Sequence, residues 1–282
     1  MPSSRADFKA VLLFFALTYA VTWASFFGAA TLSTQSWFVS PLLYVGTFAP
    51  SFVALGLTAR ETGLPGIRTL LRRVVDFHAS WRWFVFAVGY IATLKLLTAV
   101  TYRLATASWP AFGTTPLVVI PFAILISTPV QAGEEIGWRG YALPRLAERF
   151  GFPRASLLLG LLWGAWHLPL FFIPGHPNHG QPLLFFVLGS TGLSVAMTWL
   201  YMNTRGSVGF AMLMHSAVNQ TMGIVPTRLA SPGNPLAIAN VSPIMWLFIA
   251  LLWSMAAYFL LRMRRRQTSV GAMSPITAAI QE

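Results

Sequence analysis

The chain has 282 residues, of which 56% are apolar and only 9% are charged, and its mean hydropathy is +0.64. Soluble domains carry roughly a quarter charged residues, so this composition excludes a soluble globular protein, a disordered chain and a small secreted scaffold. Cysteine is absent, which also excludes disulfide frameworks, thiolate metal sites and cysteine nucleophiles.

The net charge of +12 does not indicate a nucleic-acid partner. The basic residues form short clusters between apolar runs, as they do in the cytoplasmic loops of membrane proteins. An outer-membrane barrel is not indicated either. Its strands alternate apolar and polar residues, whereas these runs are apolar on all sides. The first run has no convincing cleavage site and is interpreted as a retained span rather than a signal peptide.

The uncharged apolar runs predict about eight spanning helices, because one span needs about 20 mostly apolar residues. They are expected near residues 10–30, 40–59, 82–106, 114–133, 154–173, 182–203, 206–223 and 243–262. The fourth is expected to continue as a helix through 134–149. The predicted fold class is therefore all-α, a polytopic membrane helical bundle.

The basic residues near the span ends predict an orientation with both termini in the cytoplasm. The N-terminus, alternate loops and the C-terminal tail contain Arg5, Lys9, Arg60, Arg68, Arg72, Arg73, Arg82, Arg145, Arg149, Arg154, Arg205, Arg262, Arg264, Arg265 and Arg266. The four other loops together contain one basic residue, Arg228. The sequence predicts one transmembrane domain over 1–266 in a bacterial inner (plasma) membrane, and a polar, poorly ordered tail over 267–282.

Ionisable residues inside membrane spans are costly and mark candidate functional sites. Glu134 and Glu135 adjoin the fourth span, and they point about 100° apart on a helix. Glu135 and Arg139 are spaced i, i+4, which favours an ion pair along one face. We therefore expect Arg139 to fix Glu135 and Glu134 to face a cavity. The alternative is that both acids lie in a solvated cytoplasmic turn.

Two of the five histidines lie within apolar runs, His167 and His215. Trp163 precedes His167 by one turn, and a core histidine bonded to a backbone carbonyl is the alternative to a functional role there. Asn219 follows His215 by one turn on the same face, so that both side chains can reach one small polar target.

Together, these side chains suit hydrolysis. A carboxylate can take a proton from water, histidine can hold the water or pass the proton on, and histidine and asparagine can donate to an oxyanion. The only two aspartates, Asp7 and Asp76, lie outside the spans, which excludes an aspartyl protease dyad within the membrane. No HExxH motif occurs, and Ser190 and Ser194 lack a GxSxG elbow.

Three short segments resemble the motifs of the CAAX-protease and bacteriocin-processing family (CPBP, also called Abi) of intramembrane proteases. EEIGWR at 134–139 resembles its EExxxR motif, WGAWH at 163–167 its FxxxH motif and HSAVN at 215–219 its HxxxN motif. Their order and helical placement match the family's core over about 120–225. Trp163 stands where the family usually has phenylalanine, a difference expected to affect packing more than chemistry.

The resemblance implies an intramembrane endopeptidase with a cavity open toward the cytoplasm. It assigns catalysis to Glu134, His167, His215 and Asn219, with Glu135, Arg139 and Trp163 in support. It leaves the mechanism open between a metal-free glutamate protease and a zinc enzyme with Glu134, His167 and His215 as ligands. We favour the metal-free mechanism without a cofactor, because Glu135, the base that a zinc site would need, is expected to be tied to Arg139.

The expected partners are the lipid bilayer and a membrane-associated peptide or protein substrate, lipidated substrates included, and no nucleic acid. The alternatives are a transporter or channel that uses the intramembrane Glu and His residues as an ion or proton site, and a non-catalytic membrane partner. Lys95 lies deep in the third span and is expected to need a carboxylate or carbonyl partner. The HPNH stretch at 176–179 is interpreted as an outer loop, with a metal-binding loop as the alternative.

Overall fold

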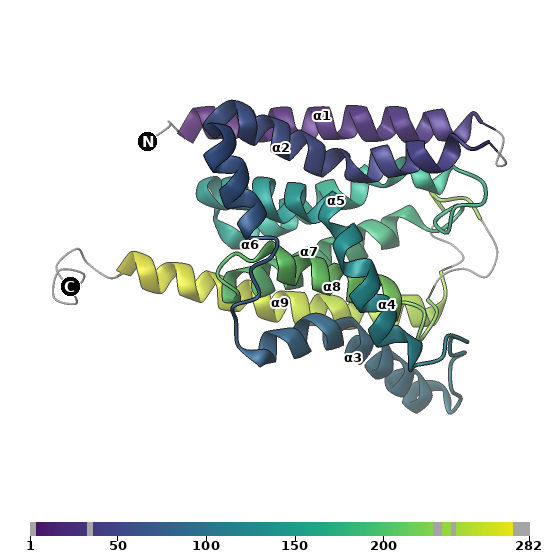
Figure 1. Cartoon of the computed structure of the whole chain (residues 1–282). Coiled ribbons are helices and arrows are strands. Elements are labelled where there is room, and N and C mark those ends of the chain that lie inside the picture. Colours follow the sequence, from purple (N-terminus) through teal and green to yellow (C-terminus); the bar gives the residue numbers. More distant parts are fainter. Residues whose placement is uncertain (1–3, 33–35, 228–232, 238–240, 273–282) are drawn as a thin grey trace.

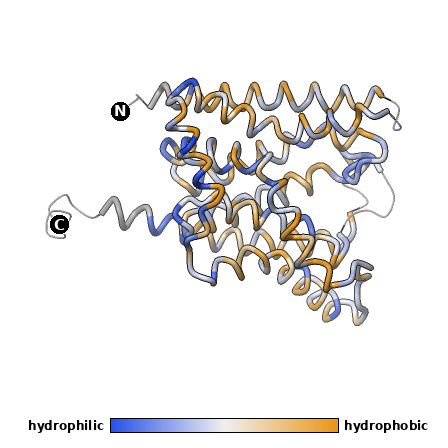
Figure 2. The backbone as a smooth tube through the Cα atoms, in the orientation of Figure 1, coloured by the Kyte–Doolittle hydropathy of each residue, from blue (hydrophilic) through white to orange (hydrophobic). Residues whose placement is uncertain are grey.

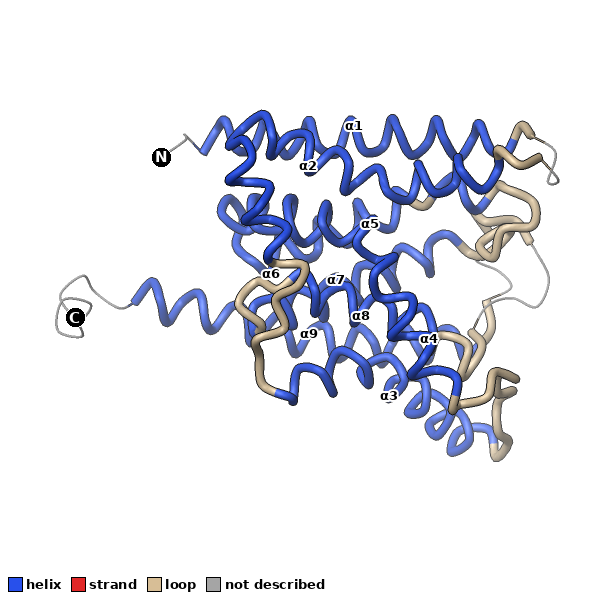
Figure 3. The backbone as a smooth tube through the Cα atoms, in the orientation of Figure 1, coloured by secondary structure: helices blue, strands red, loops and turns tan. Residues whose placement is uncertain are grey.

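The computed structural model describes the backbone of residues 4–32, 36–227, 233–237 and 241–272, and the side chains of 8–32, 36–227, 233–237 and 241–266. Within these ranges the chain forms helices and no strands (Figure 3). The predicted all-α fold class is therefore confirmed. Arg5, Arg228 and the whole predicted tail, 267–282, lie outside the described side chains.

Each predicted apolar segment contains a helix. The longer helices are α1 (Ser4–Ala30), α2 (Val39–Arg72), α3 (Trp81–Thr106), α6 (Leu143–Trp166), α7 (Leu183–Asn203), α8 (Val208–Thr221) and α9 (Pro243–Ala272). The fourth predicted span is a chain of short pieces: α4 (Val119–Ser127), the 3₁₀ turn η1 (Thr128–Gln131) and α5 (Ala132–Glu135). The π-helix η2 (Ile136–Ala142) then leads into α6, and the 3₁₀ turn η3 (Leu168–Phe171) follows α6.

Five of the described helices, α1, α2, α3, α7 and α9, are long and apolar enough to cross a membrane. The helix α8 has 14 residues and is about 21 Å long, which is shorter than the roughly 30 Å of a bilayer's hydrocarbon core. The count of eight spans and the orientation stay predictions. The helix α9 continues to Ala272, six residues into the segment predicted as a tail.

The loops of one end of the bundle contact one another across large sequence separations. Arg145 forms an ion pair with Glu61 at 2.7 Å, and Arg73 donates to the carbonyl of Gly206 at 2.9 Å. All of these residues belong to loops or helix ends that the charge pattern assigns to one side. Both termini lie at this end (Figure 1), and hydrophilic residues gather there (Figure 2).

The other loops meet at the opposite end of the bundle. The backbone N–H of Gly113 donates to Ile224 at 3.1 Å, and that of Gly233 donates to Gly180 at 2.9 Å. The alternation of loops between two ends therefore follows the pattern of basic residues. Which end faces the cytoplasm stays a prediction.

Two glycines bring α6 close to α7. A Cβ at Gly160 would lie 2.6 Å from the Cα of Thr191, and one at Gly164 would lie 3.0 Å from the Cα of Val187. Small residues spaced by four allow such close approach of helices in membranes, where packing replaces the hydrophobic drive. This contact fixes the end of α6, which carries Trp163 and leads into His167.

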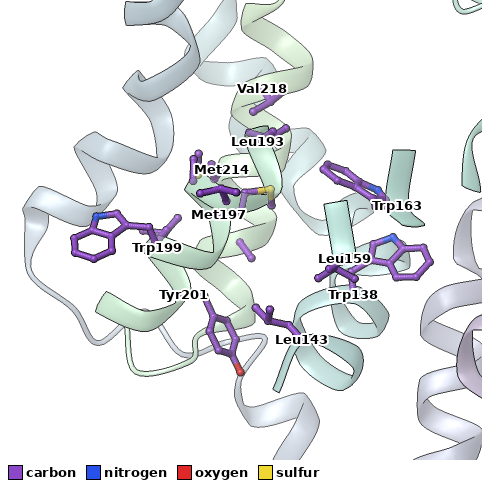
Figure 4. Packing of buried hydrophobic residues seen from close by; sticks show 14 of the residues in the cluster. Trp138, Leu143, Leu159, Trp163, Leu193, Met197, Trp199, Tyr201, Met214 and Val218 are labelled. Carbon is purple, nitrogen blue, oxygen red and sulfur yellow. The ribbon is translucent and has the colours of Figure 1, made fainter. Parts of the chain in front are cut away.

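The central core is made of large apolar side chains from most of the helices, including Trp138, Trp163, Leu159 and Met197 (Figure 4). Trp138 is fully buried, and Trp163 is nearly so. Since these two indoles also carry N–H donors, the core around them can hold a polar group, which the next section describes.

Candidate active site

The two adjacent glutamates lie where the backbone changes its helical type. They end α5, between the 3₁₀ turn η1 and the π-helix η2. π-Turns are frequent at functional sites because they re-aim side chains within a helix. Gly137 allows η2 to lie against α2, since a Cβ there would lie 2.6 Å from the backbone of Pro50. The glutamates are therefore held at a fixed depth in the bundle.

Glu135 is fully buried and joins two of the motifs. Its Oε1 lies 2.8 Å from Arg139 Nη1 and 2.8 Å from His215 Nδ1. The predicted ion pair between Glu135 and Arg139 is thus present. A carboxylate only accepts hydrogen bonds, so Nδ1 of His215 carries the proton. The bond to Glu135 orients the imidazole ring and leaves Nε2 as its second polar atom.

Glu134 points into a cavity and is held there by two indoles. Its Oε2 accepts a hydrogen bond from Trp163 Nε1 at 2.7 Å and a longer one from Trp138 Nε1 at 3.4 Å. Trp163 therefore contributes more than packing, because phenylalanine has no N–H to donate to this carboxylate; its effect on chemistry stays a prediction. Trp138 was missed from the sequence, although its i+4 spacing from Glu134 places both on one helix face.

His167 is the cap residue after α6. Its Nδ1 lies 2.8 Å from the carbonyl oxygen of Trp163, which only accepts, so Nδ1 is the protonated nitrogen here too. The ring makes edge contacts with Trp166 at 4.6 Å and Phe186 at 4.9 Å between centroids. Nε2 of His167, like that of His215, is left for other partners.

Asn219 lies one turn after His215 on α8, as expected. Its Nδ2 donates to Gln131 Oε1 at 3.5 Å. Gln131 belongs to η1, three residues before Glu134, and was not predicted from the sequence. Its only signal was a neutral polar residue in an apolar run, which is weaker than that of an ionisable residue.

The four residues assigned to catalysis line one cavity of about 700 Å³. Glu134 comes from α5, His167 from the end of α6, and His215 and Asn219 from α8. Trp163 also lines this cavity, whereas Glu135 and Arg139 lie behind its wall. The walls are mostly apolar, with Ile91, Phe185, Phe186, Leu193, Met245 and Leu252 among them.

The cavity reaches the surface at the end of the bundle opposite the termini. Three exposed residues of that end, Pro177, Gly223 and Pro226, line it. With both termini in the cytoplasm this opening faces outside, whereas the family resemblance implies a cytoplasmic opening. The two expectations exclude one another for this cavity.

The 176–179 loop contributes to the opening rather than to a cluster of ligands. His176, Pro177 and Asn178 line the cavity. Across the described residues, 4–32, 36–227, 233–237 and 241–272, no group of three or more His, Asp or Glu side chains has an arrangement that could hold a metal ion.

Comparisons with known proteins agree with the motifs. Residues 113–221 match the model of the type II CAAX prenyl endopeptidase Rce1-like family. The matched segment contains all three motifs. Both this match and a curated relative point to one family. That family is the CAAX proteases, which this chain resembles over the matched residues. The relative, CAAX prenyl protease 2 of Methanococcus maripaludis, is 25% identical over 224 residues, covering 73% of this chain and 82% of the relative.

Proposed function

We propose that this protein is an intramembrane endopeptidase of the CAAX protease type, which hydrolyses peptide bonds with a water activated by Glu134. The observation that carries the proposal is the convergence of Glu134, His167, His215 and Asn219 on one mostly apolar cavity. A transporter or channel that used these residues separately would not need them on three elements around one space.

In the proposed first step, Glu134 takes a proton from water while the water oxygen attacks the scissile carbonyl carbon. A positioned carboxylate is a suitable general base. The hydrogen bond from Trp163 occupies Oε2, so Oε1 is the atom proposed to accept the proton. The apolar walls exclude bulk water, which strengthens electrostatic interactions inside the cavity.

His167 and His215 take separate roles in this proposal. With its Nδ1 proton held by the Trp163 carbonyl, His167 accepts at Nε2 the proton that Glu134 took from water. It delivers this proton to the leaving amine nitrogen, and Glu134 returns to its carboxylate form. His215, when protonated at Nε2 and held by Glu135 at Nδ1, donates to the carbonyl oxygen as it becomes an oxyanion. The Asn219 amide is its second donor, as in other oxyanion holes.

A zinc ion held by Glu134, His167 and His215 would be the alternative means of activating water, because two histidines and one carboxylate are a known catalytic set. The residues do not fit it well. The described side chains include no group of three or more that could hold a metal ion. The hydrogen bond from Trp163 would also compete with zinc for the Glu134 carboxylate. This arrangement supports the metal-free mechanism.

The proposed substrate is a membrane-associated peptide whose chain enters the cavity. The relative is named a CAAX prenyl protease, which suggests a prenylated substrate for this chain also. The apolar walls, with Phe185, Leu193, Met245 and Leu252, are compatible with a lipidated or apolar segment.

The test is a cleavage assay on purified protein with two peptides that differ only in a prenyl group on one cysteine. Wild type is expected to cleave at least one of them, and Glu134→Gln neither at a comparable rate. Added chelator should leave the wild-type rate unchanged. Loss of activity with chelator and its recovery with zinc would refute the metal-free mechanism, and equal activity of Glu134→Gln would refute the role of Glu134.

A further inference from the structure

Asn219 is the exposed one of the four residues assigned to catalysis. Glu134 and His215 are buried, and His167 is half-buried. An exposed amide can rotate about its two side-chain torsions, whereas an oxyanion is stabilised best by donors that already point to the place where the charge develops. The proposed role of Asn219 therefore needs a neighbour that fixes the direction of its amide.

Gln131 contacts Asn219 and has a fixed orientation of its own. It is buried and lies outside the set of described residues that line the cavity. Its Nε2 donates to the carbonyl oxygen of Ser127 at 3.2 Å. Because a carbonyl oxygen only accepts, the NH2 end of Gln131 faces Ser127, and Oε1 is the end that faces Asn219.

The orientation of Gln131 determines that of Asn219. Oε1 only accepts, so Asn219 turns its NH2 end, and not its oxygen, toward Gln131. An amide nitrogen has two hydrogens. One is bound by Gln131, and the other is available to a group in the cavity that Asn219 lines. The distance of 3.5 Å between the two atoms is long, as hydrogen bonds of a site without substrate often are before they tighten in the complex.

The segment that carries Gln131 is tied to the helix that carries Asn219. The hydroxyl oxygens of Ser127, at the end of α4, and Ser216, on α8, are 2.6 Å apart. Ser216 also donates to a backbone carbonyl of α4 at 2.7 Å. Glu134 follows Gln131 by three residues in the chain. The same short segment therefore bears the proposed base and the partner of the proposed oxyanion donor.

We propose that Gln131 is a positioning residue that directs the Asn219 amide toward the developing oxyanion, and this rests on the proposed function. Gln131 does not touch the reacting atoms and acts through Asn219. The contrasting role is structural, in which Gln131 only holds η1 against α8. The two roles differ in one respect. Positioning has no effect once the Asn219 amide is removed, whereas packing of η1 matters in either case.

The experiment compares Gln131→Met in two backgrounds, since this change removes the amide and keeps a side chain of similar length. In wild type it should lower kcat about 3- to 10-fold, the usual effect of one neutral hydrogen bond, with KM little changed. In the Asn219→Ala background it should have no further effect beyond about twofold, because residues that act as a unit are not additive. An equal loss in both backgrounds, or no loss in wild type, overturns the inference.

Gln220→Met is the matched control. Gln220 neighbours Asn219 on α8, and its Nε2 donates to Ser127 Oγ at 3.2 Å. The control loses one amide bond to the same residue, while the bond between Gln131 and Asn219 stays. Its kcat should stay within about twofold of wild type, and a loss equal to that of Gln131→Met overturns the inference. Thermal melting in detergent checks folding, and Gln131→Ala, which removes the same amide, replaces Gln131→Met if that variant fails to fold.

Binding of a phosphinate peptide to the Glu134→Gln variant gives a readout without cleavage, because its anionic tetrahedral centre resembles the proposed intermediate. Gln131→Met should weaken this binding about 3- to 10-fold and leave binding of the matching substrate peptide unchanged. The loss should disappear in Asn219→Ala. If these binding results hold and wild type cleaves nothing, the proposed function alone fails. Equal phosphinate binding with and without Gln131→Met, or a loss that persists in Asn219→Ala, overturns the inference.

Discussion

The hydrogen bond from Trp163 to Glu134 gives a sharp test of how the proposed base is held. Trp163→Phe removes one N–H donor that lies 2.7 Å from Glu134 Oε2. It introduces the residue that the CAAX-protease and bacteriocin-processing family usually has at this position. The aromatic ring that contacts His215 at 5.2 Å between centroids is kept in part. The change therefore removes a polar contact with little loss of packing.

The expected loss follows from the charge of the acceptor. A hydrogen bond to a charged group contributes about 1.5–3 kcal/mol, and each 1.4 kcal/mol corresponds to about a tenfold change in rate. If the bond holds Glu134 in its reactive position, kcat should fall about 10- to 150-fold, with KM little changed. Trp138→Phe removes only the 3.4 Å bond and should cause a smaller loss.

The matched control is Trp23→Phe. Trp23 Nε1 donates to the backbone carbonyl of Trp166 at 3.0 Å, and Trp23 does not line the cavity. The control loses one indole bond to a neutral acceptor, so its melting temperature should fall while kcat stays within about twofold. The assay is single-turnover cleavage of a peptide that wild type cleaves. A Trp163→Phe variant whose kcat equals that of Trp23→Phe would refute the reasoning.

The remaining predictions concern the base, the oxyanion donors and the orientation. Glu134→Gln should lower the cleavage rate about 10²–10⁴-fold, the usual contribution of a general base, with an unchanged melting temperature; a smaller loss contradicts its role. Asn219→Ala should lower the cleavage rate about 10²–10³-fold. The double variant with His215→Ala should lose less activity than the product of the two single losses, since both residues act on one oxyanion. Multiplicative losses would show that the two residues have separate roles. The native chain has no cysteine, so single cysteines at positions 177 and 267 can be labelled from outside intact cells. Labelling at 177 and not at 267 supports the predicted orientation with the cavity opening outside, and the reverse supports a cytoplasmic opening.

Several features of this protein follow from the sequence alone. Uncharged apolar runs of about 20 residues are sufficient to specify membrane helices, because backbone polar groups in lipid must be satisfied within the segment. The pairing of Glu135 with Arg139 also follows locally, since residues four apart on a helix are neighbours. The three motifs, in their order, indicated the same family to which the comparisons find a similarity.

The contacts between motifs needed the tertiary structure. The bond between Glu135 and His215 joins residues 80 positions apart, and the Trp163 indole reaches Glu134 across 29 positions. Neither partner can be chosen from helical periodicity, which fixes only the face on which a side chain lies. That Trp163 packs in the core and also donates to Glu134 depends on how α6 lies against the segment that follows Glu134. The opening of the cavity at the end opposite the termini depends in the same way on how the loops close over the bundle, which no single segment of the sequence specifies.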